Sequence, residues 1–233
     1  MPVKPVILAA LLVLCVSATA QSARRDGGFP RFMGREVKIT EAETGADGLF
    51  PKGSASVCLE GLPRRQCYTA PEGFGRTPTA TEVHLDKNTP AILFSTASRG
   101  VSGFRMHFAL LRPGEGKDLD DLFVSDRTVS DQSQYSFWSD PAVSDAQIFV
   151  TADYVWGPDE AHHGEHRYMI SAYARKYSFD LNRFGYYLED RYMTTRKYDV
   201  EGNADILASE RQELLARLRR LREAAEPQSR RVQ

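Results

Sequence analysis

The chain has 233 residues, of which 42% are hydrophobic, 26% are charged and 10% are aromatic, an ordinary balance for a globular protein. This composition excludes extended disorder, a collagen-like fibre and a dense disulfide scaffold as descriptions of the whole chain. The formal charge is −1, from 30 Lys plus Arg against 31 Asp plus Glu, and this near-balance argues against a nucleic-acid binder, which normally carries a basic excess.

Residues 1–20 have the pattern of a cleaved secretory signal. Lys4 supplies a positive charge, an apolar run follows from Pro5 to Val16, and Ala18 and Ala20 are the small residues that a signal peptidase reads. The apolar run is too short to cross a bilayer as a helix, which needs about 20 residues. We therefore expect cleavage near Ala20 and a secreted chain, periplasmic or extracellular, with no membrane span in its mature part. An uncleaved membrane anchor is the alternative.

Cleavage at this point removes Cys15 and leaves two cysteines, Cys58 and Cys67. Two cysteines in an oxidising compartment pair most simply with each other, and Gly61 and Pro63 supply a turn between them. The sequence therefore predicts a disulfide between Cys58 and Cys67. Half of a metal site is the alternative, although the Cys-x-x-Cys spacing of such sites is absent.

The mature chain divides into an N-terminal arm and a β region. Residues 21–54 are rich in glycine and hold one strand-like stretch, 35–40, so we expect a loosely ordered arm. Residues 55–205 carry short alternating or β-branched runs separated by turn residues, which predicts an antiparallel β domain with one buried and one wet face. The expected strands are 56–59, 66–70, 81–86, 91–96, 104–111, 135–138, 147–156, 167–177, 185–189 and 192–198.

The end of the chain has a helical pattern. Leu214 and Leu218 recur at helical spacing, Ser209 is suited to cap the N-terminus, and Pro227 interrupts the pattern. We expect a helix over residues 206–226 and a disordered tail over 227–233. Its leucine face is expected to pack on the sheet, and self-association through this helix is the alternative. The predicted fold is mainly β, an antiparallel β-sandwich or partly open barrel with one C-terminal amphipathic helix.

Two parts of the β region share a pattern. Residues 91–97 and 104–110 form a strand–loop–strand unit, and residues 147–153 and 166–172 resemble it. This similarity suggests an internal duplication of a hairpin unit. The alternative is that two unrelated hairpins have the same general pattern.

The densest polar cluster lies between residues 156 and 166. Three of the five histidines in the chain, His162, His163 and His166, stand here beside Asp159 and Glu160. Imidazole and carboxylate groups are the usual protein ligands of Zn²⁺ and other divalent transition metals. These five residues are therefore a candidate metal site.

Gly157, Pro158 and Gly164 argue against a helix in this cluster, so we expect a hairpin loop. One interpretation is a polar loop whose histidines form ordinary hydrogen bonds. The other is a metal-dependent hydrolase with Glu160 or Glu165 as its base. No cofactor is firmly predicted.

Other catalytic signatures are incomplete. Residues 100–103 resemble a nucleophile elbow, but the second glycine comes one position early. Residues 114–117 lack the following Ser or Thr and the upstream glycine of a phosphate loop. The sequence therefore favours binding over catalysis.

Seven of the ten tyrosines lie between residues 168 and 198, and arginines alternate with them. A face of tyrosine and arginine can stack on sugars or grip a protein partner, because both side chains combine a large contact area with polar tips. Aromatic pairing that only stabilises the sheet is the alternative. The candidate ligand-binding residues are Trp138, Tyr154, Trp156, Arg167, Tyr168, Tyr173 and Arg175.

Three runs, 92–95, 100–103 and 156–168, carry a resemblance to a known group. Together they resemble secreted bacterial β-rich proteins with no assigned function, over roughly half of the chain. The resemblance implies export and supplies no activity, ligand or site residue. The leading expectation is an exported, non-catalytic binding protein for a protein or a cell-envelope polysaccharide.

Overall fold

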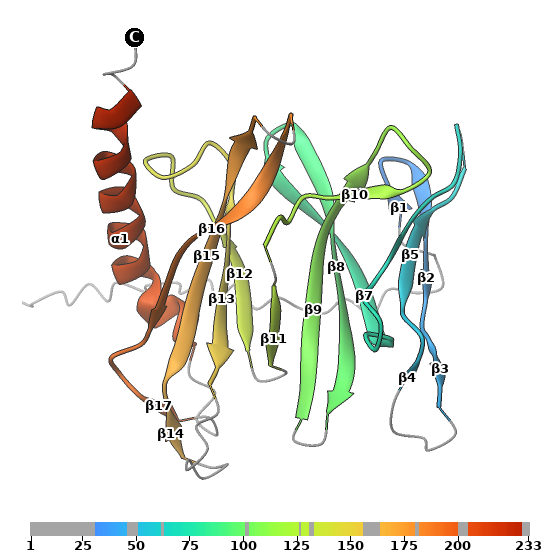
Figure 1. Ribbon diagram of the computed structural model, residues 1–233, viewed down its shortest axis with the longest axis horizontal. Coiled ribbons are helices and arrows are strands. Elements are labelled where there is room, and N and C mark those ends of the chain that lie inside the picture. The colour runs from blue at the N-terminus through green and yellow to red at the C-terminus, as the bar shows by residue number, and fades with distance from the viewer. Residues whose placement is uncertain are drawn as a thin grey trace, which may run out of the picture.

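The computed structural model describes residues 31–45, 51–61, 63–100, 103–125, 127–130, 133–155, 164–179, 182–199 and 205–229. Over these residues the chain is mainly β, with antiparallel sheets and a single helix near the C-terminus (Figure 1). The predicted fold class is therefore confirmed. The signal pattern of residues 1–20 lies outside the described residues.

The strands form three main sheets. The N-terminal sheet has the order β1 (Arg31–Phe32), β2 (Arg35–Thr40), β5 (Ser56–Leu59) and β6 (Gln66–Thr69). The middle sheet has the order β10 (Leu119–Asp121), β9 (Gly103–Pro113), β8 (Thr89–Gly100) and β7 (Arg76–Asp86), and β11 (Thr128–Ser130) also pairs with β9. The C-terminal sheet has the order β12 (Gln134–Trp138), β13 (Ile148–Tyr154), β15 (Tyr168–Ser178) and β16 (Arg183–Met193).

Three smaller units complete the described chain. These are the pair β3 (Glu43–Thr44) and β4 (Pro51–Lys52), the pair β14 (Glu165–His166) and β17 (Tyr198–Asp199), and the helix α1 (Ile206–Ser229).

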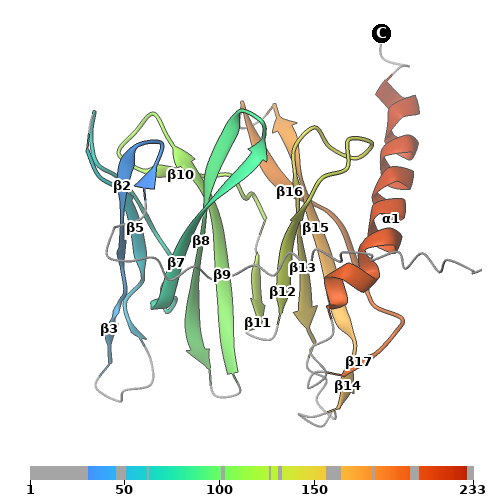
Figure 2. The ribbon, with the colours of Figure 1, turned by 180° about the vertical axis from the view of Figure 1, so that it is seen from behind.

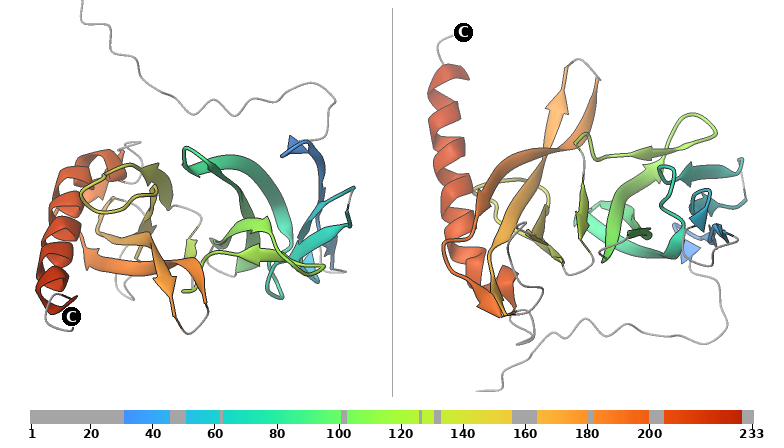
Figure 3. Two further views of the ribbon diagram at one scale, coloured as in Figure 1. Left: turned by 90° about the horizontal axis from the view of Figure 1, so that it is seen from above. Right: turned by 60° about the horizontal axis from the view of Figure 1, so that its bottom comes forward.

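The helix and the three main sheets lie in successive layers, which Figures 1 and 2 show from opposite sides. α1 covers the C-terminal sheet, which faces the middle sheet, which in turn faces the N-terminal sheet; Figure 3 shows the same order from above. A separate hydrophobic cluster fills each space between neighbouring layers. Burial of apolar surface between the layers is therefore the main source of stability.

Because of this layering, central strands are buried on both faces. In β8, Phe94 packs toward the N-terminal sheet and Leu93 packs toward the C-terminal sheet. In β13, Val150 packs beneath α1, while Phe149 packs on the middle sheet. The expectation of one wet face is corrected for these strands, since helix and sheets cover both sides.

Phe149 is the centre of the cluster between the middle and C-terminal sheets. Its side chain is fully buried, and its ring centroid lies 5.6 Å from that of Phe108, 5.0 Å from that of Phe123 and 6.0 Å from that of Tyr173. These rings come from strands of both sheets and from the segment after β10. Phe149 thus joins elements that are far apart in the sequence.

The segment after β10 joins the middle and C-terminal sheets along one edge. The backbone N–H of Val124 donates to the carbonyl of Tyr186 at 3.1 Å, and the N–H of Tyr186 donates to the carbonyl of Leu122 at 2.6 Å. The Asp121 carboxylate accepts hydrogen bonds from the N–H of Leu110, 3.1 Å away, and from the Arg127 guanidinium. This edge connection agrees with the predicted sandwich or partly open barrel.

The N-terminal segment differs from the expectation of a loosely ordered arm. β2 matches the one strand expected there, and it pairs with β5 in antiparallel register. Phe32 and Val37 are buried in the cluster between the N-terminal and middle sheets. Burial of these two apolar side chains anchors the described part of this segment in the layered structure.

Several strand boundaries differ from the sequence pattern. The two strands expected over 185–189 and 192–198 are replaced by the continuous strand β16, whose pairing with β15 shifts register at Ala172 and Tyr173. β10, β11 and β14 were not expected, because two or three residues are too short to show an alternating pattern. The two similar stretches do form hairpin pairs, β8–β9 and β13–β15, and their common origin stays a prediction.

α1 extends over more of the chain than the expected 206–226. Its N-terminal cap is Asp205, whose carboxylate accepts a hydrogen bond from the N–H of Ala208 at 2.8 Å. Ser209 lies inside the helix instead, and its hydroxyl donates to the carbonyl of Ile206. The helix continues to Ser229, so three residues expected in the tail are helical.

The leucine face of α1 packs on the C-terminal sheet as expected, with Leu214 and Leu218 buried there. Polar contacts fix the helix: Arg219 donates to the buried carboxylate of Asp140 at 2.7 Å, and Tyr192 donates to Glu210 at 2.9 Å. Among the described residues, no helix has both the length and the apolar character needed to cross a membrane.

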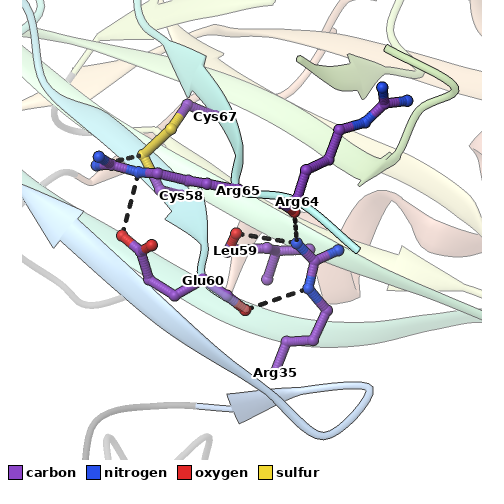
Figure 4. Close-up of a disulfide and its surroundings, with 7 residues drawn as sticks. All are labelled: Arg35, Cys58, Leu59, Glu60, Arg64, Arg65 and Cys67. Atoms are coloured by element: carbon purple, nitrogen blue, oxygen red, sulfur yellow. Dashed lines mark hydrogen bonds and ion pairs between the residues drawn. A yellow bond between two sulfur atoms is a disulfide. The ribbon is translucent and has the colours of Figure 1, made fainter. Parts of the chain in front are cut away.

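The predicted disulfide is present between Cys58 and Cys67, whose Cα atoms are 4.1 Å apart in register on β5 and β6 (Figure 4). Arg35 of β2 also holds this hairpin, because its guanidinium donates to the carbonyl oxygens of Leu59 at 3.0 Å and Arg64 at 2.6 Å. The disulfide therefore closes a hairpin that hydrogen bonds already shape.

Replacing Phe149 with alanine is expected to lower the free energy of unfolding by about 3–5 kcal/mol, because it leaves a cavity in a fully packed aromatic cluster. Urea denaturation measures this change. Phe179→Ala is the matched control: Phe179 is 88% exposed, so its loss should stay within about 0.5 kcal/mol. A loss below about 1 kcal/mol for Phe149→Ala would contradict the central role of this ring.

Replacing both cysteines, Cys58→Ser with Cys67→Ser, is expected to destabilise the protein by about 2–3 kcal/mol, because the unfolded chain loses a short closed loop. Urea denaturation with and without a thiol reductant tests this. The reductant should destabilise the wild type by a similar amount and leave the double variant unchanged. A wild type that is equally stable under both conditions would refute a stabilising disulfide.

Candidate functional site

The structure places most of the candidate aromatic residues in the core. Trp138, Tyr154 and Tyr168 are 6%, 3% and 2% exposed and pack beneath α1, and Tyr173 is 2% exposed between the middle and C-terminal sheets. These residues do not form the exposed binding face that the sequence predicts, because α1 and the middle sheet cover them. Trp156 lies outside the described residues.

The two candidate arginines lie near opposite ends of β15. Arg167 precedes the strand and is exposed, without a hydrogen bond or ion pair to another described residue. Arg175 lies toward the other end and is half-buried, with ion pairs to two aspartates. The structure therefore does not gather the predicted binding residues into one site: Arg175 lines one cleft and Trp138 lines a separate groove.

Most of the candidate metal ligands, Asp159, Glu160, His162 and His163, lie outside the described residues. His166 is described: it is buried in β14, with its ring centroid 4.7 Å from that of Tyr154. Within the described ranges, no group of three or more His, Cys, Asp or Glu side chains could hold a metal ion. Metal binding by this loop, with Zn²⁺ or another divalent ion, stays a prediction.

The cleft beside Arg175 has a volume of about 380 Å³ and lies between the middle and C-terminal sheets. The middle sheet contributes Arg112 from β9 and Asp120 from β10, and the C-terminal sheet contributes side chains from β15 and β16. We call it the arginine–aromatic cleft. The lining side chains that carry its chemistry are Arg112, Asp120, Arg175, Tyr177, Arg183, Phe184 and Tyr186.

Arg175 is the anchored cation of this cleft. Its guanidinium forms ion pairs with Asp86 and Asp145, each at 2.8 Å, and lies 5.3 Å from the centroid of the Phe184 ring. Burial lowers the pKa of Arg175, but hydrogen bonds to the two carboxylates outweigh burial and raise it. Arg175 therefore keeps its charge and ties β15 to the end of β7.

Arg112 and Arg183 are different, because neither side chain forms a hydrogen bond or ion pair with another described residue. The Nε atom of Arg112 is buried without a hydrogen-bond partner among those residues. Asp120 lies opposite Arg112 in the β9–β10 register, but its carboxylate lies beside Gly114. A Cβ atom placed on Gly114 would be 2.8 Å from the Oδ1 atom of Asp120. The cleft thus holds two guanidinium groups whose charge the described residues leave uncompensated.

Aromatic rings form the outer wall of the cleft. Tyr177 is 40% exposed and Phe184 is 54% exposed, and their ring centroids lie 5.2 Å apart in an edge-on contact. Tyr186 forms the buried floor and donates its hydroxyl to the carbonyl of Gln147 at 2.8 Å. Burial raises the pKa of Tyr186 above its ordinary value, so its hydroxyl stays protonated.

A larger groove, of about 820 Å³, lies between β12 and the first turns of α1. Its cation, Arg211, lies over the Trp138 ring at 5.6 Å, so its charge already has an aromatic partner. The arginine–aromatic cleft is the stronger candidate because two of its arginines lack such a partner.

This arrangement can bind an anionic or polar ligand through guanidinium groups and stack its apolar face on aromatic rings. Tyr177 and Arg183 belong to the segment whose richness in tyrosine and arginine predicts a binding face. Most of the aromatic candidates in that prediction are buried instead, because sequence alone does not show which face a helix covers. Arg112 carried no sequence signal, since it belongs to a distant strand.

Comparison with known protein families, with curated proteins and with solved structures gives no match.

Replacing Asp86 with asparagine is expected to reduce stability by about 1 kcal/mol at neutral pH, because Arg175 loses one of its ion pairs. The N–H of Asn88 and the Arg175 guanidinium hold the pKa of Asp86 below its ordinary value. The stabilisation is therefore present above about pH 4 and is lost as the pH falls through the lowered pKa.

Unfolding measurements between neutral pH and about pH 3 should show the wild type and Asp86→Asn converging at the acidic end. Glu72→Gln is the control, because Glu72 is exposed and forms no ion pair with another described residue, so its effect should be small throughout. A difference between wild type and Asp86→Asn that persists unchanged at the acidic end would contradict the role given to the charged carboxylate.

Proposed function

We propose that this chain is an exported, non-catalytic binding protein whose ligand site is the arginine–aromatic cleft. The observation that carries the proposal is the presence of two uncompensated arginines, Arg112 and Arg183, beside the exposed rings of Tyr177 and Phe184. Export is supported by the signal pattern of residues 1–20 and by the disulfide, since disulfides persist mainly in oxidising compartments.

The cleft is better suited to binding than to stability. Like charges close together repel each other, and the two aspartates that form ion pairs with Arg175 form none with Arg112 or Arg183. An exposed phenylalanine likewise contributes little to the core. A ligand with negative or polar groups and an apolar face would satisfy both features at once.

The size and shape of the cleft favour a polysaccharide over a folded protein as the ligand. A volume of about 380 Å³ is within the range of concave small-ligand sites. A stable interface with a folded protein normally buries more than about 1,000 Å² of surface, so it would have to extend well beyond the residues that line this cleft. We therefore propose that a short stretch of a cell-envelope polysaccharide binds here, and a protein ligand is the competing outcome.

Replacing Phe184 with alanine is expected to weaken binding to protein-free envelope polysaccharide about tenfold, because it removes the ring that packs on the sugar. Binding is measured with the purified protein and a polysaccharide fraction prepared from bacterial envelopes. Met33→Ala is the control, since Met33 is an exposed apolar side chain that does not line the cleft.

Protease treatment of a crude envelope fraction separates the two ligand classes. Capture that survives proteolysis and depends on Phe184 supports the polysaccharide proposal. Capture that disappears with proteolysis would point to a protein ligand. No capture by the wild type, or equal capture by Phe184→Ala, would overturn the proposed site.

A further inference from the structure

We infer that the arginine–aromatic cleft recognises a carboxylate on an acidic sugar chain, with Arg112 and Arg183 binding the carboxylate while the Phe184 ring packs on the sugar. This inference rests on the proposed function and names the ligand class for the same cleft. Three properties of the cleft carry it: its charge, the state of its guanidinium groups and its aromatic wall.

The residues that line the cleft include more arginines than carboxylates. Arg112, Arg175 and Arg183 line it, and Asp120 is the one carboxylate among the described lining residues. Asp86 and Asp145 compensate Arg175, but both contact that side chain alone among the arginines of the cleft. The attraction for an anion is therefore local to Arg112 and Arg183, which line the concave site and form no ion pair with another described residue.

The guanidinium groups are suited to a planar anion. Arginine presents a rigid fork of N–H donors that matches the two oxygens of a carboxylate. Arg112 and Arg183 line the cleft and form no hydrogen bond with another described residue, so their guanidinium N–H groups favour a ligand that supplies acceptors. A neutral sugar would leave this fork and its charge unmatched.

The aromatic wall favours a sugar as the carrier of the carboxylate. The Tyr177 and Phe184 rings are 40% and 54% exposed at the cleft, so each presents apolar surface to a ligand. A sugar ring has an apolar face of C–H groups and polar edges, which fits an aromatic wall beside hydrogen-bond donors. An extended acidic peptide is the competing carrier, and the experiment below separates the two.

The arginines themselves provide a matched set of variants. Arg183 is exposed, so Arg183→Gln removes a charge without disturbing packing. Arg112→Lys keeps the charge of the half-buried Arg112 but removes its fork, so it tests geometry apart from charge. Arg167→Gln is the control: Arg167 is exposed and uncompensated among the described residues, but it lies at the opposite end of β15.

The probe is a defined oligogalacturonate, titrated into the purified protein in a calorimeter, with its fully methyl-esterified form as the neutral match. We expect the acid to bind at least tenfold more tightly than the ester, and to bind more weakly as salt is added. Arg183→Gln, Arg112→Gln and Arg112→Lys should each lose about tenfold in affinity, the equivalent of about 1.4 kcal/mol. Arg167→Gln should bind as the wild type does.

Several outcomes would overturn the inference. One is an ester that binds as well as the acid, and another is an Arg167→Gln loss equal to that of Arg183→Gln. Tighter binding of polyglutamate would replace the sugar with an acidic peptide, and tighter binding of inorganic polyphosphate would replace the carboxylate with a phosphate. Each of these results rejects the recognition of a sugar carboxylate. The proposed function would still stand if envelope polysaccharide bound to the wild type and bound more weakly to Phe184→Ala.

Discussion

The layered structure depends on one constraint: the central strands of the middle and C-terminal sheets, such as β8, β13 and β15, must be largely apolar on both faces. An antiparallel sheet often has one face in water, but here a helix or another sheet covers each side. Phe149 and Val150 show the result, since adjacent residues of β13 enter different cores. Charged side chains are thereby excluded from the middle of these strands and collect at their ends. β15 follows this rule, from the buried Tyr168 to the exposed Tyr177, and the candidate cleft lies at its exposed end.

Much of the fold could be predicted from the sequence, because it depends on local patterns. β2 and β5 match their expected ranges, and the disulfide follows from two cysteines on one hairpin. The C-terminal helix was visible in the spacing of Leu214 and Leu218, although its cap at Asp205 was not, since that role depends on where the first turn begins. Strands of two or three residues carry too little pattern to be recognised.

The candidate site was predictable only in part. The concentration of tyrosine and arginine indicated a segment that lines part of the cleft, yet a tyrosine fits a core and a surface equally well. Tyr168 and Tyr177 belong to the same strand, and only the position of the covering helix separates the buried one from the exposed one. Arg112 enters the cleft from another sheet, so no window of sequence could have joined it to Arg183.

The edge connection after β10 has a consequence for how the protein acquires its structure. The N–H of Val124 and the carbonyl of Leu122 find their partner in Tyr186, which is synthesised 62 residues after Val124. The middle sheet therefore keeps an unfinished edge until β16 has emerged, and pairings between such distant residues form slowly. During that interval the exposed edge can recruit a neighbouring chain. A nascent chain that is kept apart from other copies until β16 has been synthesised would escape that hazard.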